Sequence, residues 1–150
     1  MRILLVEDDE FKSDRLKIFL EDTYPNSEIT LARSVNTARR AIKSDKFDVI
    51  VLDMSLPTFD VSPGESGGRP QGFGGREVLR DMKRSGLSTP VIIVTQYEAF
   101  DSQGQKMDLP SLARILESEY PDTFRQVVYY NAATDEWKQK LNLALTSIDK

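Results

Sequence analysis

Short runs of apolar residues alternate along the chain with longer stretches in which apolar residues recur every three or four positions. The short runs are rich in valine, isoleucine and leucine, and they occupy residues 3–6, 49–52, 91–94 and 127–130, with a weaker run at 28–32. Runs that are this short and apolar throughout are typical of strands in a parallel sheet covered on both faces. The pattern therefore predicts a sheet of five largely buried strands.

The longer stretches have the periodicity of amphipathic helices, with apolar side chains along one face. They occupy residues 12–21, 35–43, 75–83, 109–119 and 134–148. Strands that alternate with helices predict right-handed crossovers between parallel strands. We therefore expect one domain over residues 1–150 with a doubly wound (βα)5 fold of the α/β class, in which a five-stranded parallel sheet carries helices on both faces.

Polar residues that can carry chemistry directly follow several of the predicted strands. They are Glu7, Asp8 and Asp9 after the first strand, Asp53 after the third, Thr95 after the fourth and Asn131 after the fifth. In a doubly wound sheet the functional crevice lies outside the carboxyl ends of the strands, so these side chains should meet at one edge. Acids and a hydroxyl without a glycine-rich phosphate loop favour a hard cation over a nucleotide as the ligand.

Two predicted connections are longer than is usual between such elements. The connection over residues 56–74 follows Asp53, contains several glycines and prolines, and is predicted to be an extended loop. The connection over residues 96–108 is polar, and it precedes a helix with Pro110 near its first turn, where proline is favoured. It is also predicted to be an extended loop.

The composition limits the chemistry that this chain can perform. It has no cysteine and no histidine among its 150 residues, which excludes disulfides, thiol nucleophiles and imidazole bases. Its net charge of −4 offers no basic face for nucleic acid, and no apolar stretch approaches the roughly 20 residues of a membrane span. Met1 leads into a strand-like run rather than a signal peptide. We expect a soluble cytoplasmic domain that binds neither nucleic acid nor membranes directly.

Three segments together resemble the motifs of two-component response regulator receiver domains. They read ILLVEDDE at residues 3–10, VIVLDMSLP at 49–57 and VIIVT at 91–95. The resemblance covers the chain from Met1 to about Thr95 and weakens after that. It implies a flavodoxin-like receiver fold and a phosphorelay signalling module that is phosphorylated on an aspartate.

The resemblance also implies the identity of the site residues. Asp53 falls on the phosphoacceptor of the family, and Glu7 and Asp8 fall on its acidic pair. In receivers Mg²⁺ is held by residues that correspond here to Asp8, Asp53 and the backbone carbonyl of Ser55, while Glu7 reaches the ion through water. Asp9 is then a neighbour of the site. Oxygen ligands and retained waters suit the coordination chemistry of magnesium.

Switching in the family depends on a hydroxyl on the fourth strand, which falls on Thr95, and on an aromatic side chain of the fifth strand. Tyr129 or Tyr130 is the candidate, and because neighbouring residues in a strand face opposite ways, we expect one of them in the core together with Trp137. The resemblance implies a histidine kinase or phosphotransfer protein as donor and a downstream protein partner. It also allows a homodimer through the fourth helix, fifth strand and fifth helix.

The family pattern has a lysine at the end of the fifth strand that this sequence lacks. Aligning the last helix on Thr134, a good N-cap residue, puts Asn131 where the lysine would be. An amide donates a neutral hydrogen bond, which is weaker than a charged one, so the phosphorylated state should be less favoured. Lys106, in the second long connection, is an alternative source of positive charge.

Other interpretations of these residues stay open. Glu7, Asp8 and Asp9 also suit a solvated turn that caps the first helix, and Asn131 also suits a simple turn. The chain as a whole also suits a pseudo-receiver, which keeps the fold and acts as a protein interaction module without phosphate. Phosphatases of the haloacid-dehalogenase kind need a second acid two residues after the nucleophile, where this chain has Ser55. We therefore expect that the chain is not an enzyme.

Overall fold

Strands and helices alternate along most of the chain in the computed structural model, which describes residues 1–57, 59, 74–96, 99–102 and 105–148, with only the backbone for 99–102, 105 and 106. The elements are β1 (Arg2–Val6), α1 (Glu10–Thr23), β2 (Glu28–Ala32), α2 (Val35–Ser44), β3 (Val49–Leu52), α3 (Gly74–Arg84), β4 (Val91–Thr95), β5 (Ala99–Ser102), β6 (Gln105–Asp108), α4 (Leu109–Glu119), β7 (Phe124–Tyr129) and α5 (Glu136–Ile148). None of these helices is long and apolar enough to cross a membrane.

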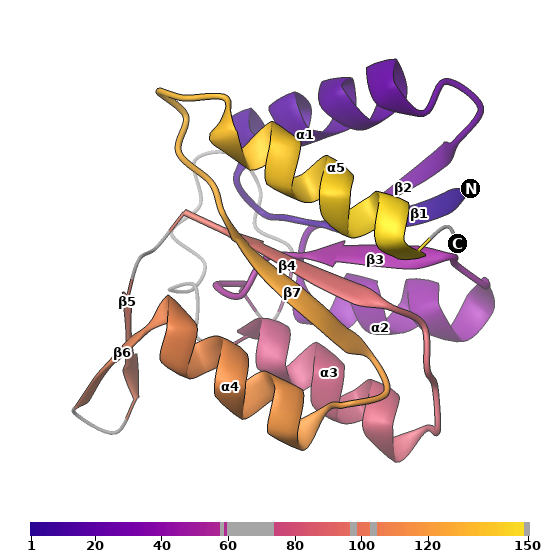
Figure 1. The fold of residues 1–150 in the computed structure, drawn as a ribbon. Helices are drawn as coiled ribbons and strands as arrows, with labels where there is room; N and C mark the ends of the chain where they lie inside the picture. Colours follow the sequence, from indigo (N-terminus) through magenta and orange to yellow (C-terminus); the bar gives the residue numbers. More distant parts are fainter. Residues whose placement is uncertain (58, 60–73, 97–98, 103–104, 149–150) are drawn as a thin grey trace.

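The main sheet has five parallel strands in the order β2-β1-β3-β4-β7. Helices α1 and α5 cover one face, and α2, α3 and α4 cover the other (Figure 1). The predicted α/β fold with helices on both faces is therefore confirmed. Because β1 lies between β2 and β3, the direction of winding reverses there, and the carboxyl ends of β1 and β3 border the crevice in which such sheets bind ligands.

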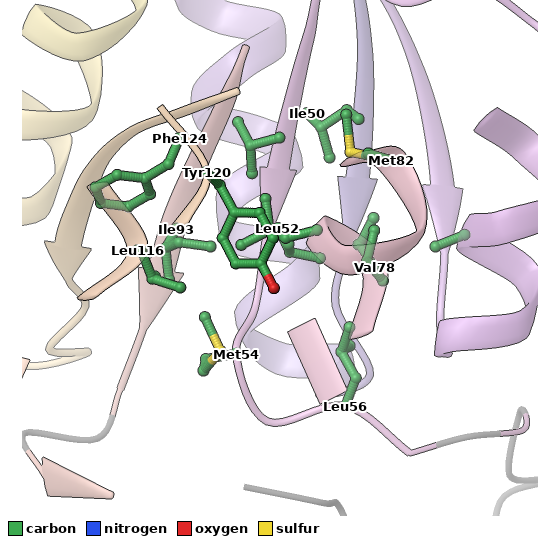
Figure 2. Packing of buried hydrophobic residues seen from close by; sticks show 14 of the residues in the cluster. Ile50, Leu52, Met54, Leu56, Val78, Met82, Ile93, Leu116, Tyr120 and Phe124 are labelled. Atoms are coloured by element: carbon green, nitrogen blue, oxygen red, sulfur yellow. The ribbon is translucent and has the colours of Figure 1, made fainter. Parts of the chain in front are cut away.

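Buried side chains on both faces explain why the strands read as continuous apolar runs. On one face, Ile50, Leu52 and Ile93 of the sheet pack with Val78 of α3 and Leu116 of α4 (Figure 2). On the other face, strand residues pack with α1 and α5 in a second cluster that contains Trp137 and Tyr130. The edge strand β2 is exposed at three of its five residues, which explains its weaker apolar signal.

Capping side chains fix where several helices begin. Asp9 accepts a hydrogen bond from the backbone N–H of Lys12 (3.1 Å), so α1 begins at Glu10, two residues before its predicted start. Ser34 and Thr37 form a capping box at the start of α2. The side chain of Asp108 caps α4, which matches its predicted bounds.

Two regions depart from the sequence prediction. The connection over 96–108 was predicted to be a loop, but its described backbone contains the antiparallel hairpin β5–β6, which joins β4 to α4 (Figure 1). The last helix begins at Glu136 rather than Thr134, because the backbone N–H of Thr134 donates to the carbonyl of Asn131 (3.2 Å) in a turn. Residues 58 and 60–73, most of the predicted 56–74 loop, lie outside the described residues.

Candidate functional site

Two acidic residues lie side by side because the strands they follow are neighbours in the sheet. The backbone N–H of Asp53, after β3, donates to the carbonyl of Val6 in β1 (2.9 Å). The backbone N–H of Glu7, after β1, donates to the carbonyl of Ala32 in β2 (3.0 Å). These bonds continue the sheet's pairing for one residue, so both carboxylates start from fixed backbone positions at the β1–β3 crevice.

Glu7, Asp8 and Asp53 form a cluster in which one carboxylate oxygen from each residue lies within 4.8 Å of the others. Glu7 and Asp53 are buried and Asp8 is partly exposed. Three buried or half-buried carboxylates repel one another unless positive charge lies between them. Carboxylate oxygens are the ligands that Mg²⁺ prefers, and the half-exposed side of the cluster leaves access for the waters that this ion retains. The residues present therefore fit a divalent cation.

Lys12 of α1 is the site residue that the sequence analysis missed. Its Nζ atom lies 2.5 Å from Oε1 of Glu7 and 3.3 Å from Oδ1 of Asp53. It also donates to the backbone carbonyl of Val94 at 2.8 Å. The side chain is only 2% exposed. A lysine is almost never buried this fully unless it is paired, so Lys12 belongs to the acidic cluster.

The position of Lys12 relative to the apolar residues of α1 is a sequence signal that could have revealed its burial. Lys12 precedes Leu16 by four residues and Phe19 by seven, so it lies on the apolar stripe of α1 rather than on its solvated face. A charged residue on that stripe, one turn after the acidic segment, points at the strand ends. The predicted helix began at this residue, and no role was assigned to Lys12 from the sequence.

Burial and pairing shift the pKa values of all these groups. Burial, with repulsion from Asp53, raises the pKa of Glu7 from 4.5 to about 8. Burial also raises the pKa of Asp53 and of Asp8, although Lys12 opposes both shifts. Burial alone would lower the pKa of Lys12, but the attraction of Asp53 and Glu7 outweighs it and raises the pKa. One ammonium between two buried carboxylates therefore leaves a proton on the acidic pair near neutral pH.

The raised pKa of Glu7 predicts how the stability of metal-free protein depends on pH. The folded state keeps the proton of Glu7 up to about pH 8, whereas the unfolded chain releases it near 4.5. The folded state therefore binds more protons in this window, and the free energy of unfolding should fall as the pH rises through it. Urea unfolding in a chelator, followed by the fluorescence of Trp137, measures the slope.

Variants identify the group that is responsible for this slope. Glu7→Gln should flatten the dependence, because the side chain no longer titrates. Glu21→Gln, at an exposed position of α1, is the control with the same chemical change and should leave the slope as in the wild type. A free energy of unfolding that rises between pH 5 and 8 in the wild type would contradict the assignment.

Asp9 and Ser55 lie beside the cluster in different roles. The side chain of Asp9 caps α1, and its backbone N–H donates to Oε2 of Glu7 (3.1 Å). The capping interpretation thus holds for Asp9, while Glu7 and Asp8 belong to the cluster. Ser55 is buried in the loop after Asp53, and its carbonyl role stays a prediction.

Helix α3 holds the loop that carries Ser55. The backbone N–H of Gly75 donates to the carbonyl of Met54 (2.9 Å). A Cβ atom on Gly75 would lie only 2.5 Å from the carbonyl oxygen of Asp53, so the helix can approach this closely only because residue 75 is a glycine. The helix thereby fixes the backbone of the predicted phosphoacceptor and of Met54, the residue before Ser55.

Thr95, Tyr129 and Tyr130 lie at the ends of β4 and β7. Thr95 is fully buried, and its carbonyl accepts a hydrogen bond from the backbone N–H of Tyr130 (2.7 Å). Tyr130 is buried, and its ring lies 5.1 Å from that of Trp137 in the core, as predicted for one of the two tyrosines. Tyr129 is half-buried, so it is the tyrosine that stays a candidate for the switch.

Asn131 lies in the turn between β7 and α5. Its side chain is exposed, and its Oδ1 accepts a hydrogen bond from the backbone N–H of Ala133 (3.0 Å). The turn is tied to α1, since Arg15 donates to the carbonyl of Ala132 (2.8 Å). The side chain of Lys106 lies outside the described part of the chain. Among the described side chains of the cluster, positive charge comes from Lys12.

Comparison with known protein families gives a match over most of the chain. Residues 3–112 match the family described as the response regulator receiver domain. Two curated relatives named Detocs response regulatory protein DtcB are each 31% identical to this chain. The alignment with the protein of Enterobacter cloacae covers 99% of this chain and 100% of that protein. The alignment with the protein of Vibrio alginolyticus covers 92% of this chain and 95% of that protein.

Solved structures with the same fold are more distant in sequence. The response regulator protein TrrA of Thermotoga maritima, in complex with Mg(2+)-BeF, superposes with a TM-score of 0.61 at 22% identity and covers 95% of this chain and 97% of its own. The receiver domain of sensor histidine kinase PA1611 of Pseudomonas aeruginosa, with magnesium in its active site cleft, superposes with a TM-score of 0.60 at 17% identity. This match covers 99% of this chain and 98% of that domain. These likenesses establish the fold.

Proposed function

Since the chain belongs to the response regulator receiver domain family of two-component signalling, we propose that it accepts a phosphoryl group on Asp53 beside Mg²⁺ and changes a protein-binding surface in response. The observation that carries the proposal is the cluster of Glu7, Asp8 and Asp53 at the β1–β3 crevice, where a doubly wound sheet binds its ligand. Asp53 is the member that follows the central strand β3.

The metal would be held by the carboxylates of Asp8 and Asp53 and by the backbone carbonyl of Ser55, with Glu7 reaching it through water. Magnesium accommodates few protein ligands together with several waters, and the partial exposure of Asp8 leaves room for them. Bound at this place, Mg²⁺ supplies positive charge that reduces repulsion between two anionic reactants and stabilises the transition state.

The reaction is a transfer of one phosphoryl group. An oxygen of the Asp53 carboxylate attacks the phosphorus atom of the donor, and a new P–O bond forms. The bond between phosphorus and the donor's own atom breaks, and its electron pair leaves with the donor group. The tight packing of Gly75 against the backbone of Asp53 supports the backbone that carries the attacking carboxylate.

Phosphorylation changes the charge and the hydrogen-bond acceptors at the crevice. The acyl phosphate carries roughly 1.5 to 2 negative charges in place of the single charge of the free carboxylate, and its new acceptor oxygens are ones that the hydroxyl of Thr95 can meet. Thr95 pairs in register with Tyr129 of β7, so a movement at Thr95 is adjacent to the half-buried tyrosine. The surface formed by α4, β7 and α5 is then the surface that changes.

The partners follow from this function. The donor is a histidine kinase or a phosphotransfer protein, and the output is a contact with a downstream protein or with a second copy of the chain through α4, β7 and α5. We further propose that residues 1–150 act as one receiver domain in the cytoplasm, without direct nucleic-acid or membrane binding. The transfer modifies the chain itself, so the domain is a signalling protein rather than an enzyme.

Mass spectrometry after treatment with acetyl phosphate and Mg²⁺ tests the proposal. The wild type should gain one phosphoryl group that is lost in base, and Asp53→Asn should gain none. Asp22→Asn, which removes an exposed acid near the end of α1, is the matched control and should be labelled as the wild type is. Equal labelling of Asp53→Asn would contradict the proposal, and no labelling of the wild type would favour the phosphate-independent pseudo-receiver.

A further inference from the structure

The buried ammonium of Lys12 has no role in the function proposed so far. It comes from α1, whereas the lysine expected from the family pattern would follow the last strand of the sheet. That position holds Asn131, whose side chain is exposed and accepts a hydrogen bond from the backbone of Ala133. The end of β7 therefore supplies no charged partner for a phosphoryl group on Asp53.

The geometry of Lys12 shows a cation held in place at the nucleophile. Its Nζ atom contacts Oδ1 of Asp53, Oε1 of Glu7 and the carbonyl oxygen of Val94. It also lies 5.7 Å from the centre of the Tyr130 ring, on whose face a cation is stabilised. Contacts from β4 and from the segments after β1, β3 and β7 thus surround the ammonium.

We propose that Lys12 is the cation that binds the phosphoryl oxygens on Asp53, a task that Asn131 cannot perform. The inference rests on the proposed function and adds a binding residue to it. An ammonium has three N–H donors, and one of them is now directed at the Asp53 oxygen that lies 3.3 Å away. Attaching a phosphoryl group to that carboxylate brings acceptor oxygens into reach of the same donor.

The same contacts give Lys12 a second effect, of opposite sign. Without metal, the ammonium pairs with Glu7 and Asp53, two of the three carboxylates that would bind a divalent cation. Lys12 therefore competes with the metal for negative charge. Removing the ammonium should strengthen the binding of Mg²⁺ alone and weaken the binding of a phosphoryl group.

This pair of opposite changes separates a phosphoryl-binding role from a purely structural one. If Lys12 only kept the buried carboxylates apart from one another, its loss would destabilise the fold or tighten metal binding, and the affinity for a phosphoryl analogue would follow the affinity for the metal. A phosphoryl-binding lysine predicts that the two affinities move in opposite directions. Charged hydrogen bonds are roughly twice as strong as neutral ones, so the loss of affinity for the phosphoryl analogue should be large.

The experiment is calorimetry on the full chain, with Mg²⁺ alone and then with beryllofluoride at saturating Mg²⁺. Lys12→Gln should bind Mg²⁺ several times more tightly than the wild type, and it should bind beryllofluoride about tenfold or more weakly. Lys12→Met, whose unbranched apolar side chain fills the same buried space, is a second variant that should behave in the same way. Lys17→Gln removes an exposed positive charge from the same helix and should change neither affinity by more than about twofold.

The possible failures are distinct. If the wild type binds beryllofluoride, Asp53→Asn does not, and both Lys12 variants bind it as tightly as the wild type does, the role of Lys12 is overturned while the proposed function stands. If the wild type binds no beryllofluoride at saturating Mg²⁺, the proposed function fails and the inference fails with it. Loss of binding in Lys17→Gln equal to that in Lys12→Gln would show a general effect of net charge, which also overturns the inference.

Discussion

Replacing Asp8 by asparagine is expected to lower the affinity for Mg²⁺ by about a hundredfold, which corresponds to about 3 kcal/mol of binding free energy. Asp8 is the carboxylate of the cluster that Lys12 does not contact within 4 Å, so its full charge is available to a metal. An amide oxygen can still coordinate, but it brings no negative charge, and the remaining carboxylates already share an ammonium. The loss of affinity for Mg²⁺ should therefore be much larger than the loss caused by replacing an ordinary surface acid.

Isothermal titration with Mg²⁺ at low ionic strength measures this effect. Asp14→Asn is the matched control, because it removes an exposed acid from α1 with the same change in net charge. The control should stay within about twofold of the wild type, since exposed charges are screened. An Asp8→Asn protein that keeps the affinity of the control would place the metal somewhere other than the β1–β3 crevice.

Replacing Trp137 by alanine is expected to lower the free energy of unfolding by about 3–5 kcal/mol. Trp137 is 1% exposed and packs between Phe19 of α1, at a ring distance of 5.4 Å, and Tyr130 after β7, at 5.1 Å. It therefore joins both helices on this face of the sheet, and its removal leaves a cavity that three separate elements would have to close. A domain of this size is commonly stable by only about 5–15 kcal/mol, so the loss is a large share of the total.

Urea unfolding followed by far-ultraviolet circular dichroism measures this loss, because the variant lacks the fluorescent tryptophan. Leu143→Ala on the same helix is the control, since Leu143 is 69% exposed and should change stability by less than about 0.5 kcal/mol. If both variants unfold at the same urea concentration, α5 does not pack on the sheet through Trp137.

The parts of the fold that were predictable are those in which the local pattern and the tertiary environment agree. Strand β3 is buried along its whole length, and its sequence of four apolar residues has the bounds of the strand. Helix α4 also matches its predicted bounds, since it starts at Leu109 behind the Asp108 cap and has Pro110 in its first turn. The cluster of Glu7, Asp8 and Asp53 was predictable because parallel strands end at one edge of a sheet.

The parts that were not predictable depend on contacts that no short window contains. Lys12 is charged, yet it lies on the buried stripe of α1 because two carboxylates from other segments neutralise it. The β5–β6 hairpin has a polar sequence without the alternation that marks a half-buried strand. The start of α5 moved to Glu136 because Asn131 and Thr134 form a turn first.

The burial of Lys12 also changes how the missing lysine is interpreted. From the sequence alone, Asn131 indicated a site that lacks positive charge and a weakened phosphorylated state. In the structure, a cation from a different element lies 3.3 Å from the predicted phosphoacceptor. The weakening that Asn131 alone implied is therefore expected only when Lys12 is removed.

A crystal structure of the protein with Mg²⁺ and beryllofluoride is the most direct test of the central claim, that the β1–β3 crevice accepts a phosphoryl group on Asp53. We expect the beryllium atom bonded to the Asp53 carboxylate, with Mg²⁺ held by Asp8, Asp53 and the carbonyl of Ser55, and with Nζ of Lys12 at hydrogen-bond distance from a fluoride. Beryllofluoride bonded to another carboxylate, or a metal ion held away from Asp8 and Asp53, would contradict the claim.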